Sequence, residues 1–306
     1  MKDRVHIVLA TYNGEKYIRE QLDSLLTQSY EKLTIEVCDD GSTDGTTAII
    51  EEYMTRDERI SLHKNSVNLG FVKNFLEGMK RSSAPYVMFC DQDDIWNRDK
   101  VEITLKAMKQ AEKDVSGKPI LVFTDAMNFN SITGEEQGLF HETSHLDVKK
   151  VDTAHLFMEN KCIGCTMMMN EAVLPYLSEL PEEIRVHDWW IALICSHFGL
   201  VHYVSQATLR YRQHEGNQIG GGSYSDYLKR RLAHRKEQRQ VLTQTYRQGA
   251  AFLELFGEQM DEKQRVVAEQ FASMEKAGFW GRRYRMIRFG FQKSGLVRNV
   301  GLFLLI

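Results

Sequence analysis

The chain has 306 residues, and 42% of them are hydrophobic, which is enough for one large α/β domain or two smaller ones and excludes a disordered or fibrous protein. Its 39 Lys and Arg residues nearly balance its 42 Asp and Glu residues, so the overall charge gives no indication of nucleic acid as a partner. The five cysteines lack the paired spacings of a zinc ribbon, which favours reduced thiols in a cytosolic protein.

The first hundred residues alternate short apolar runs with helical patterns. We expect strands at 5–10, 33–40, 59–64 and 86–91, and helices within 12–28, from Asp44 onward and over 71–82. This alternation is typical of βαβ units in a largely parallel sheet. Such sheets bind ligands at the carboxyl ends of their strands, so we expect a binding site there.

The alternation continues after residue 97. We expect helices at 98–114, 152–160, from Glu171 and over 187–199, strands at 119–130 and within 200–222, and a small-residue stretch at 161–170. From about residue 224 the pattern changes to long, polar helices rich in Arg and Gln. The sequence therefore predicts an α/β domain over residues 1–222, divided near residue 97, and a helical extension over 223–306.

Two clusters of aspartates follow predicted strands: Asp39-Asp40, and Asp91 with Asp93 and Asp94. Because the strands of a parallel sheet end at one edge, we expect both clusters to face one crevice. Three carboxylates this close repel one another unless a cation or hydrogen-bond donors are present. Mg²⁺ and Mn²⁺ take one or two carboxylates plus substrate phosphates, so the second cluster predicts a metal and diphosphate site. The alternatives are a solvated acidic loop or a helix N-cap.

Four segments taken in order, 6–30, 36–46, 68–80 and 86–100, carry a resemblance to a known family. Together they resemble the family 2 glycosyltransferases of the GT-A fold, especially bacterial enzymes that build rhamnose-containing surface polysaccharides. The resemblance covers about residues 5–218. It implies an α/β fold with a Rossmann-like, mixed and mostly parallel sheet flanked by helices, in which residues 1–97 bind the nucleotide sugar and 98–222 bind the acceptor.

The resemblance also assigns residues to the donor. It implies that Thr11, Tyr12 and Asp40, with Asp39 beside it, hold the nucleoside. It implies that Asp91 and Asp93 hold Mn²⁺ or Mg²⁺ against the diphosphate, Asp91 also touching the nucleotide.

The segment 209–222 is similar to the family's closing motif, which makes His214 a metal or diphosphate ligand. Its neighbours Arg210 and Arg212 become cationic partners of the leaving diphosphate, in a lid that ends at the glycines 220–222.

An inverting transfer needs a general base on the face opposite the leaving group. By resemblance Asp188 occupies that position; the alternative is a helix N-cap. The family more often has Glu where His187 stands, which leaves the role of position 187 open. Trp189 and Trp190 are either core residues or a stacking platform for a sugar. Further candidates for sugar contacts are Asp94, Trp96 and His187.

The segment from Gly278 to the end contains six Lys or Arg residues, interleaved with aromatic and aliphatic ones, and no acidic residue. This pattern favours a basic amphipathic segment on the anionic inner face of the cell membrane. A nucleic acid is a weaker partner, because no base-reading module accompanies the segment. The alternative is a helix packed on the domain or in a homo-oligomer interface. We expect no membrane span and no signal peptide, and so a peripheral cytoplasmic protein.

The leading hypothesis is a metal-dependent inverting glycosyltransferase that passes L-rhamnose from dTDP-rhamnose to a lipid-linked glycan acceptor. A UDP-hexose donor is the first alternative. The others are a nucleotidyltransferase, although the first loop has a single glycine instead of a glycine-rich phosphate loop, and a non-catalytic scaffold that binds nucleotide sugars.

Overall fold

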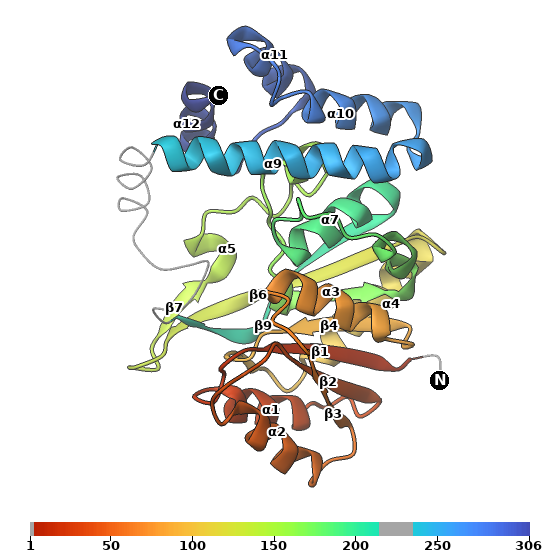
Figure 1. Cartoon of the computed structure of the whole chain (residues 1–306), viewed down its shortest axis with the longest axis vertical. Coiled ribbons are helices and arrows are strands. Elements are labelled where there is room, and N and C mark those ends of the chain that lie inside the picture. The colour runs from red at the N-terminus through yellow and green to blue at the C-terminus, as the bar shows by residue number, and fades with distance from the viewer. Residues whose placement is uncertain (1–2, 214–234) are drawn as a thin grey trace.

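Among the residues that the structure describes, a mixed sheet of nine strands forms the centre of the molecule, with a stack of helices above it (Figure 1). The computed structural model describes residues 3–213 and 235–306. The strand order is β3-β2-β1-β4-β8-β6-β9-β5, and β7 pairs with β6 off this path. The predicted mixed α/β sheet with flanking helices is confirmed.

The four strands of the first half are parallel to one another, as the sequence predicts. They are β1 (Val5–Thr11), β2 (Leu33–Asp39), β3 (Ile60–Lys64) and β4 (Tyr86–Cys90). β1 alternates between the two faces of the sheet: Ile7 and Leu9 pack in one core, and Val8 packs in the other. Because both faces are covered, the strand is a continuous apolar run, which is what made it recognisable.

The second half adds antiparallel strands. β8 (Met167–Asn170) pairs antiparallel with both β4 and β6 (Ile120–Asn130), and β9 (Leu200–Gln213) runs parallel to β6. The short strands β5 (Ile95–Trp96) and β7 (Glu136–Leu139) pair antiparallel with β9 and β6. Half of the eight pairings between described strands are therefore antiparallel, a larger share than the sequence pattern indicated.

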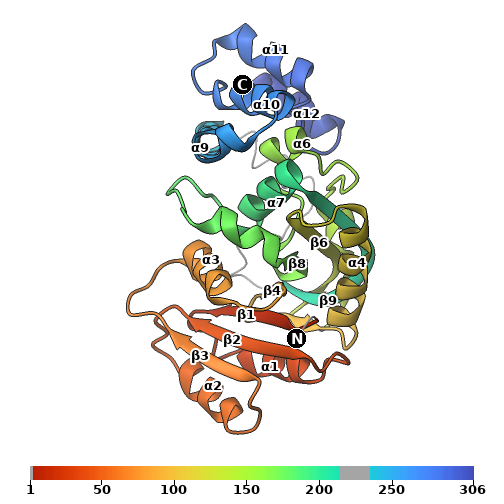
Figure 2. The ribbon, with the colours of Figure 1, turned by 90° about the vertical axis from the view of Figure 1, so that its right-hand side faces the viewer.

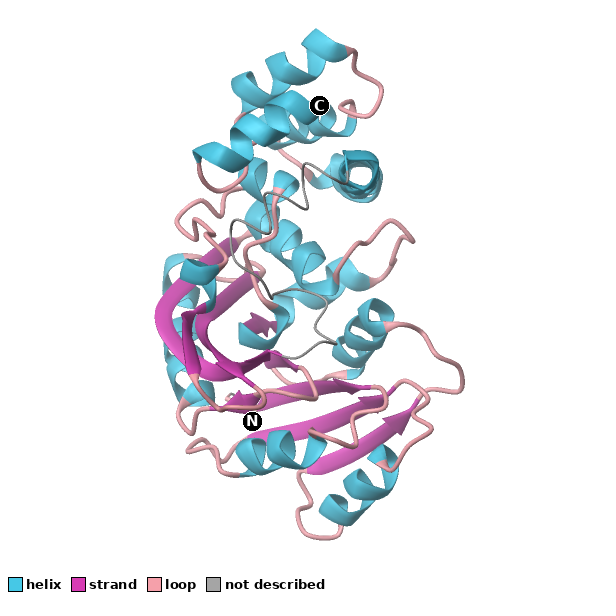
Figure 3. Ribbon diagram, turned by 90° about the vertical axis from the view of Figure 1, so that its left-hand side faces the viewer, coloured by secondary structure: helices cyan, strands magenta, loops and turns pink. Residues whose placement is uncertain are grey.

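Helices cover both faces of the sheet (Figures 2 and 3). One core lies under α1 (Ile18–Leu26), α2 (Thr46–Met54) and α4 (Lys100–Asp114). The other lies under α3 (Phe71–Arg81), α6 (Thr153–Met158) and α7 (His187–Phe198). The remaining elements are α5 (Phe140–Thr143) and the 3₁₀ turns η1 (Gly164–Thr166), η2 (Glu171–Leu177) and η3 (Gly257–Gln259). The helix expected from Glu171 is thus a 3₁₀ segment.

The C-terminal extension is helical, as predicted, and packs on α6 and α7. Over residues 235–306 its helices are α9 (Arg235–Phe256), α10 (Glu262–Ala272), α11 (Phe279–Phe289) and α12 (Leu296–Leu305). α9 crosses above α7, and the other three helices lie beyond it (Figure 1). Within residues 3–213 and 235–306, no helix is long and apolar enough to span a membrane.

Trp189 and Trp190 are core residues. Trp190 is fully buried, and its ring lies edge-on to that of Phe252 with centroids 5.3 Å apart. Trp189 is 5% exposed, and its indole N–H donates to the carbonyl oxygen of Leu156. Neither ring is available as a sugar platform, so the core alternative is the one that the structure supports.

Phe252 should determine whether the extension and the α/β domain unfold together, because it contacts Phe157, Trp190 and His197 from α9. Phe252→Ala should lower the free energy of unfolding by about 3–5 kcal/mol, measured by urea denaturation. Val241→Ala, on the exposed side of the same helix, should change it by less than about 0.5 kcal/mol. A loss below about 1 kcal/mol in Phe252→Ala would mean that the extension contributes little to the stability of the domain.

Candidate active site

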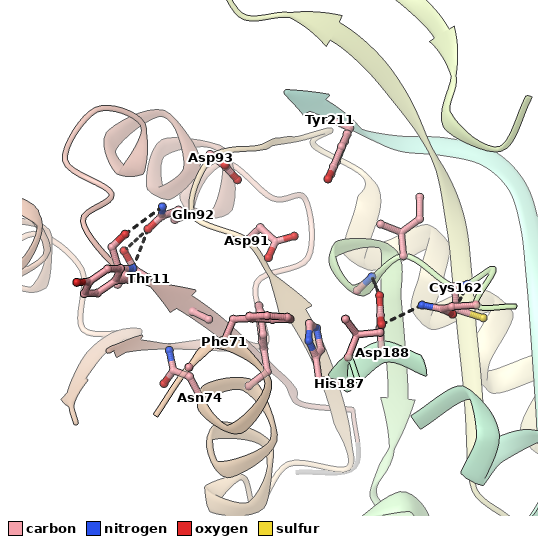
Figure 4. A pocket seen from close by; sticks show the side chains of 18 of the residues that line it. Thr11, Phe71, Asn74, Asp91, Gln92, Asp93, Cys162, His187, Asp188 and Tyr211 are labelled. Atoms are coloured by element: carbon pink, nitrogen blue, oxygen red, sulfur yellow. Dashed lines mark hydrogen bonds between the residues drawn. The ribbon is translucent and has the colours of Figure 1, made fainter. Parts of the chain in front are cut away.

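A cavity of about 470 Å³ lies at the carboxyl ends of β1 and β4, next to the first turns of α3 and α7 (Figure 4). Seven of the predicted site residues line it: Thr11, Tyr12, Asp40, Asp91, Asp93, His187 and Asp188. They come from four separate segments of the chain, which the sheet brings to one edge. The expected crevice at the strand ends is therefore present, and it is concave and partly apolar, as small-molecule sites usually are.

The loops after β1 and β4 are joined by Gln92, a residue that the sequence analysis did not single out. Its Oε1 accepts from the hydroxyl of Thr11 at 2.7 Å and from the backbone N–H of Tyr12 at 2.9 Å. A Cβ at Gly14 would lie 2.4 Å from the same oxygen, so a side chain at this position would displace the Gln92 amide. The ring of Tyr12 is half exposed at the rim of the cavity.

Asp40 lines the cavity, and its carboxylate also shapes the entry to α3. Oδ1 accepts from the backbone N–H of Leu69 at 2.7 Å and from the Asn65 amide at 2.9 Å, and Oδ2 accepts from the N–H of Gly70 at 2.8 Å. Gly70 has φ +78°, which favours glycine. Asp40 thus fixes the loop that leads to Phe71 on the cavity wall.

Asp39 does not line the cavity. Its Oδ2 accepts from the backbone N–H groups of Gly41 and Ser42, at 3.2 and 3.1 Å, in the turn after β2. Its side chain is 2% exposed. The structure therefore gives Asp39 a place in the turn and leaves Asp40 as the member of the pair that a ligand can reach.

The carboxyl groups of the second acidic cluster lie close together. Burial, with the charges of Asp93 and Asp188, raises the pKa of Asp91 to about 7. Burial and the charges of Asp93 and Asp91 raise the pKa of Asp94 well above its usual range. Asp94 accepts from the backbone N–H of Arg212, but its Oδ2 is buried with no hydrogen-bond partner among the described residues. Such a cluster is favourable only with bound protons or a cation.

The donor set fits a hard divalent cation through its carboxylates. Oxygens of Asp91 and Asp94 and the sulfur of Cys165 lie within 4.8 Å of one another, and Asp93 lies outside this group but on the cavity wall. Burial raises the pKa of the Cys165 thiol well above its usual range, so the thiol stays protonated and is a poor ligand for Mn²⁺ or Mg²⁺. The predicted ligand His214 lies outside the described residues.

Asp188 lies across the cavity from this cluster, in the first turn of α7 (Figure 4). Its Oδ1 accepts from the Asn160 amide at 2.9 Å, and its Oδ2 accepts from the N–H of Gly164 at 3.1 Å. The N-cap of α7 is Val186, so Asp188 is not the capping residue. Burial raises the pKa of Asp188 to about 7, against the lowering effect of its hydrogen bonds. A carboxyl group tuned in this way suits proton transfer near neutral pH.

The loop 159–164, which donates hydrogen bonds to Asp188, is held in place by a buried polar network. The Nε2 of His141 lies 3.0 Å from the carbonyl oxygen of Lys161, and its Nδ1 lies 2.9 Å from Asp125. The hydroxyl of Tyr203 donates to the other oxygen of Asp125 at 2.8 Å. These residues come from β6, α5 and β9, so no local pattern in the sequence could have grouped them with Asp188.

His187 forms part of an aromatic wall beside Asp188. Its ring stacks on Phe75 with centroids 4.1 Å apart and meets Phe71 edge-on at 6.1 Å. Burial lowers the pKa of His187 to about 3, so the imidazole is neutral at physiological pH. A Cβ at Gly164 would lie 2.7 Å from the Nε2 of His187, so only glycine fits there. Where the family more often has an acid, this chain has a neutral ring.

Four further candidates do not line the cavity, which argues against direct contacts with sugar or diphosphate. Trp96 and Asp94 are 3% and 1% exposed and do not line it. Arg212 pairs with Glu20 and donates to the carbonyl oxygen of Asp93 at 2.7 Å, which ties β9 to the acidic loop. Arg210 donates to the carbonyl oxygen of Gly134 at 3.2 Å.

Comparison with known proteins identifies the class. Residues 6–172 match the family described as Glycosyl transferase family 2, a match over more than half of the chain. The chain therefore belongs to this family of glycosyltransferases.

Two curated relatives are similar to this chain over different shares of its length. A dTDP-rhamnosyl transferase, RfbG of Shigella flexneri, is 28% identical over 226 residues, which cover 69% of this chain and 73% of the relative. The glycosyltransferase GlyA of Streptococcus pneumoniae is 35% identical over 114 residues, 37% of this chain and 16% of the relative. This chain thus matches most of the first relative and only a small part of the second.

Two solved structures share the fold. TarS 1-349 of S. aureus in complex with UDP-GlcNAc has a TM-score of 0.59 at 19% identity, over 94% of this chain and 73% of that one. The mannosyltransferase PcManGT of Pyrobaculum calidifontis, in complex with GDP-Man and Mn²⁺, has a TM-score of 0.52 at 15% identity, over 99% and 79%. At these identities the likeness shows the GT-A-like fold alone.

The raised pKa of Asp91 predicts how the stability of the protein changes with pH. Its folded pKa of about 7 exceeds the ordinary value of 3.8, so its contribution to the free energy of unfolding is complete below about pH 4 and is lost as the pH rises towards 7. Asp91→Asn should therefore unfold at a higher temperature than the wild type at pH 8 in EDTA, by at least about 2 °C, and the gap should shrink at pH 4. Calorimetric scans measure both. The exposed control Asp114→Asn should show no such gap, and a wild type more stable than Asp91→Asn at pH 8 would contradict the assignment.

Proposed function

We propose that this glycosyltransferase is an inverting, metal-dependent enzyme that transfers L-rhamnose from dTDP-rhamnose to a hydroxyl group of a lipid-linked glycan, in the synthesis of a bacterial surface polysaccharide. The observation that carries the proposal is the pair of opposed acidic groups in one cavity. Asp91 and Asp93 lie on one side, and Asp188, with a pKa of about 7, lies on the other. A transferase that inverts its sugar needs this separation of leaving-group site and base.

The chain's own residues supply binding and proton transfer. Thr11, Tyr12 and Asp40 surround the nucleoside at the end of β1, and Asp91 and Asp93 face the diphosphate. Bound Mn²⁺ or Mg²⁺ supplies positive charge that stabilises the leaving nucleoside diphosphate. Asp188 accepts the proton of the acceptor hydroxyl while that oxygen forms a bond to the anomeric carbon. The bond between this carbon and the diphosphate oxygen breaks, and its electron pair leaves with the nucleoside diphosphate.

Two observations support rhamnose as the sugar. The RfbG relative bears the name of a dTDP-rhamnosyl transferase. The wall between Asp91 and Asp188 is formed by the rings of Phe71, Phe75 and neutral His187, which suit the methyl group of a 6-deoxy sugar. A hexose would place its 6-hydroxyl against this wall without a hydrogen-bond partner, which costs free energy. A UDP-hexose remains the second candidate donor, because the TarS neighbour is complexed with UDP-GlcNAc.

The other two hypotheses lack such support. A nucleotidyltransferase or a scaffold that only binds nucleotide sugars has no use for a buried carboxyl group held by Asn160 and Gly164 opposite the acidic cluster. The metal-dependent transfer uses every acidic residue on the cavity wall.

We also propose that the enzyme works at the inner leaflet of the cell membrane, where it would encounter a lipid-linked acceptor.

Asp188→Asn tests the base directly. It keeps the size of the side chain but cannot take the proton, so kcat should fall by about 10²-fold or more while donor affinity stays within about twofold. Turnover with donor and a glycan acceptor, and calorimetric titration of the donor, measure the two. Asp93→Ala is the matched variant. It should lose metal-dependent donor binding, which Asp188→Asn should keep. Wild-type turnover in Asp188→Asn would exclude it as the base.

Phe71→Ser tests the donor wall. Replacing the ring with a hydroxyl should reduce the preference for dTDP-rhamnose over dTDP-glucose, expressed as a ratio of kcat/KM values, by about tenfold. The control Ile132→Ser, 92% exposed and outside the cavity lining, should leave the ratio unchanged. An unchanged ratio in Phe71→Ser would mean that the aromatic wall does not select the donor sugar.

A further inference from the structure

α11 exposes large apolar side chains along one face. Trp280, Tyr284 and Ile287 are 78%, 62% and 68% exposed, and their spacings of four and three residues place them on one side of the helix. Arg288, next in sequence to Ile287, is also exposed. An aromatic, an aliphatic and a basic residue therefore share a surface that no described part of the chain covers.

α12 repeats the arrangement with aliphatic residues. Leu296, Val300 and Leu304 recur every fourth residue and are 79%, 51% and 74% exposed. Val297 and Phe303 flank this row and are 49% and 36% exposed. Isolated apolar residues on a surface need no explanation, but a continuous row along a helix indicates a binding surface.

The two helices are held to each other through a buried arginine. The guanidinium of Arg283 lies 3.5 Å from the ring centroid of Phe279 on α11 and 5.0 Å from that of Phe303 on α12. Its side chain is only 5% exposed. Cation–π contacts of this kind fix the first turn of α11 against the last turns of α12. The two apolar rows therefore belong to one unit.

This unit is attached to the acceptor side of the cavity. Arg298 of α12 pairs with Glu159 at 3.0 Å, and the backbone N–H of Ser294 donates to the other oxygen of Glu159 at 2.6 Å. Glu159 directly precedes Asn160, which donates to Asp188. The hydroxyl of Ser294 accepts from the N–H of Asp147, next to Leu146 on the cavity wall.

The charge of the unit favours a negatively charged occupant. Residues 278–306 contain six Lys or Arg residues and no Asp or Glu. A second copy of the chain would bring the same positive charges face to face, which opposes docking of two such surfaces. Trp and Tyr prefer the boundary between headgroups and acyl chains, aliphatic rows enter the acyl region, and Arg binds anionic headgroups.

We propose that the surface formed by Trp280, Tyr284, Ile287, Arg288, Leu296, Val300 and Leu304, the α11–α12 surface, docks on an anionic lipid bilayer. The helices lie on the bilayer, since no described helix is long enough to cross it. Docking through this unit holds the loop 159–164, and with it Asp188, close to the lipid surface. This last step rests on the proposed function, whereas docking itself does not.

Sedimentation of the full chain with vesicles tests the proposal. The wild type should sediment with phosphatidylcholine vesicles that contain about 30% phosphatidylglycerol, and less so with phosphatidylcholine alone or at high salt. Trp280→Ser/Ile287→Ser and Leu296→Ser/Leu304→Ser should each weaken partitioning by about tenfold or more. The double control Ile132→Ser/Val241→Ser removes exposed apolar side chains elsewhere and should sediment like the wild type.

Three outcomes would overturn the proposal: no sedimentation of the wild type, equal sedimentation of all variants, or loss of a wild-type dimer in the α11 or α12 variants without any vesicle binding. The last would assign the surface to a second copy of the chain. Donor titration without vesicles separates the two proposals. Docking variants should bind donor like the wild type, whereas a wild type that docks but binds no nucleotide sugar would refute the proposed function alone.

Discussion

The concentration of aspartate carboxyl groups around one small cavity is the constraint on which the rest of the structure depends. Asp91, Asp93 and Asp188 reach this cavity from opposite walls, and burial with mutual repulsion raises the pKa of Asp91 to about 7. Such an arrangement is unfavourable in isolation and persists because the surrounding fold determines it. The cation and diphosphate of the proposed function would supply positive charge and make the arrangement favourable.

The two walls are stabilised in different ways. Asp188 receives hydrogen bonds from Asn160 and Gly164, so its position is fixed before any substrate arrives. Asp94, behind the opposite wall, keeps a buried oxygen without a described partner. This asymmetry fits the proposed roles: a general base must be held in place, whereas a carboxylate that binds a metal gains its partner on binding.

α7 connects this chemistry to the rest of the molecule. Its first turn carries His187 and Asp188 into the cavity, while ten of its twelve residues are buried between the sheet and the C-terminal helices. The contact between Trp190 and Phe252 makes α9 a support for the helix that presents Asp188, the proposed base. The extension is therefore part of the site's scaffold, and α12 continues that support to Glu159.

Much of the fold was predictable from local pattern. The continuous apolar run of β1 and the amphipathic spacing of Ile18 and Leu22 in α1 each follow from how those segments are covered. β8 was missed because its sequence, MMMN, has no alternation and its antiparallel partners β4 and β6 lie far away in the chain. α7 is buried on all sides, so periodicity could not decide between core and platform for its tryptophans.

The site was predictable only in part, for the same physical reason. Aspartates at strand ends indicate a shared crevice because parallel strands end together. The brace of Asp125, His141 and Tyr203 joins three distant elements, and only the folded chain brings them together. Arg212 was a reasonable partner for a diphosphate by sequence, yet its guanidinium is held by Glu20 and the carbonyl oxygen of Asp93.

Calorimetric titration of the wild-type chain with nucleotide sugars, first with Mn²⁺ and then with excess EDTA, would show directly whether the acidic cavity binds a donor through a metal. We expect saturable binding of dTDP-rhamnose to one site with Mn²⁺, and loss of that binding in EDTA. Equal affinity in EDTA would contradict a metal held by the acidic wall. No binding of dTDP-rhamnose or of any UDP-sugar would contradict the assignment of the cavity to a nucleotide-sugar donor.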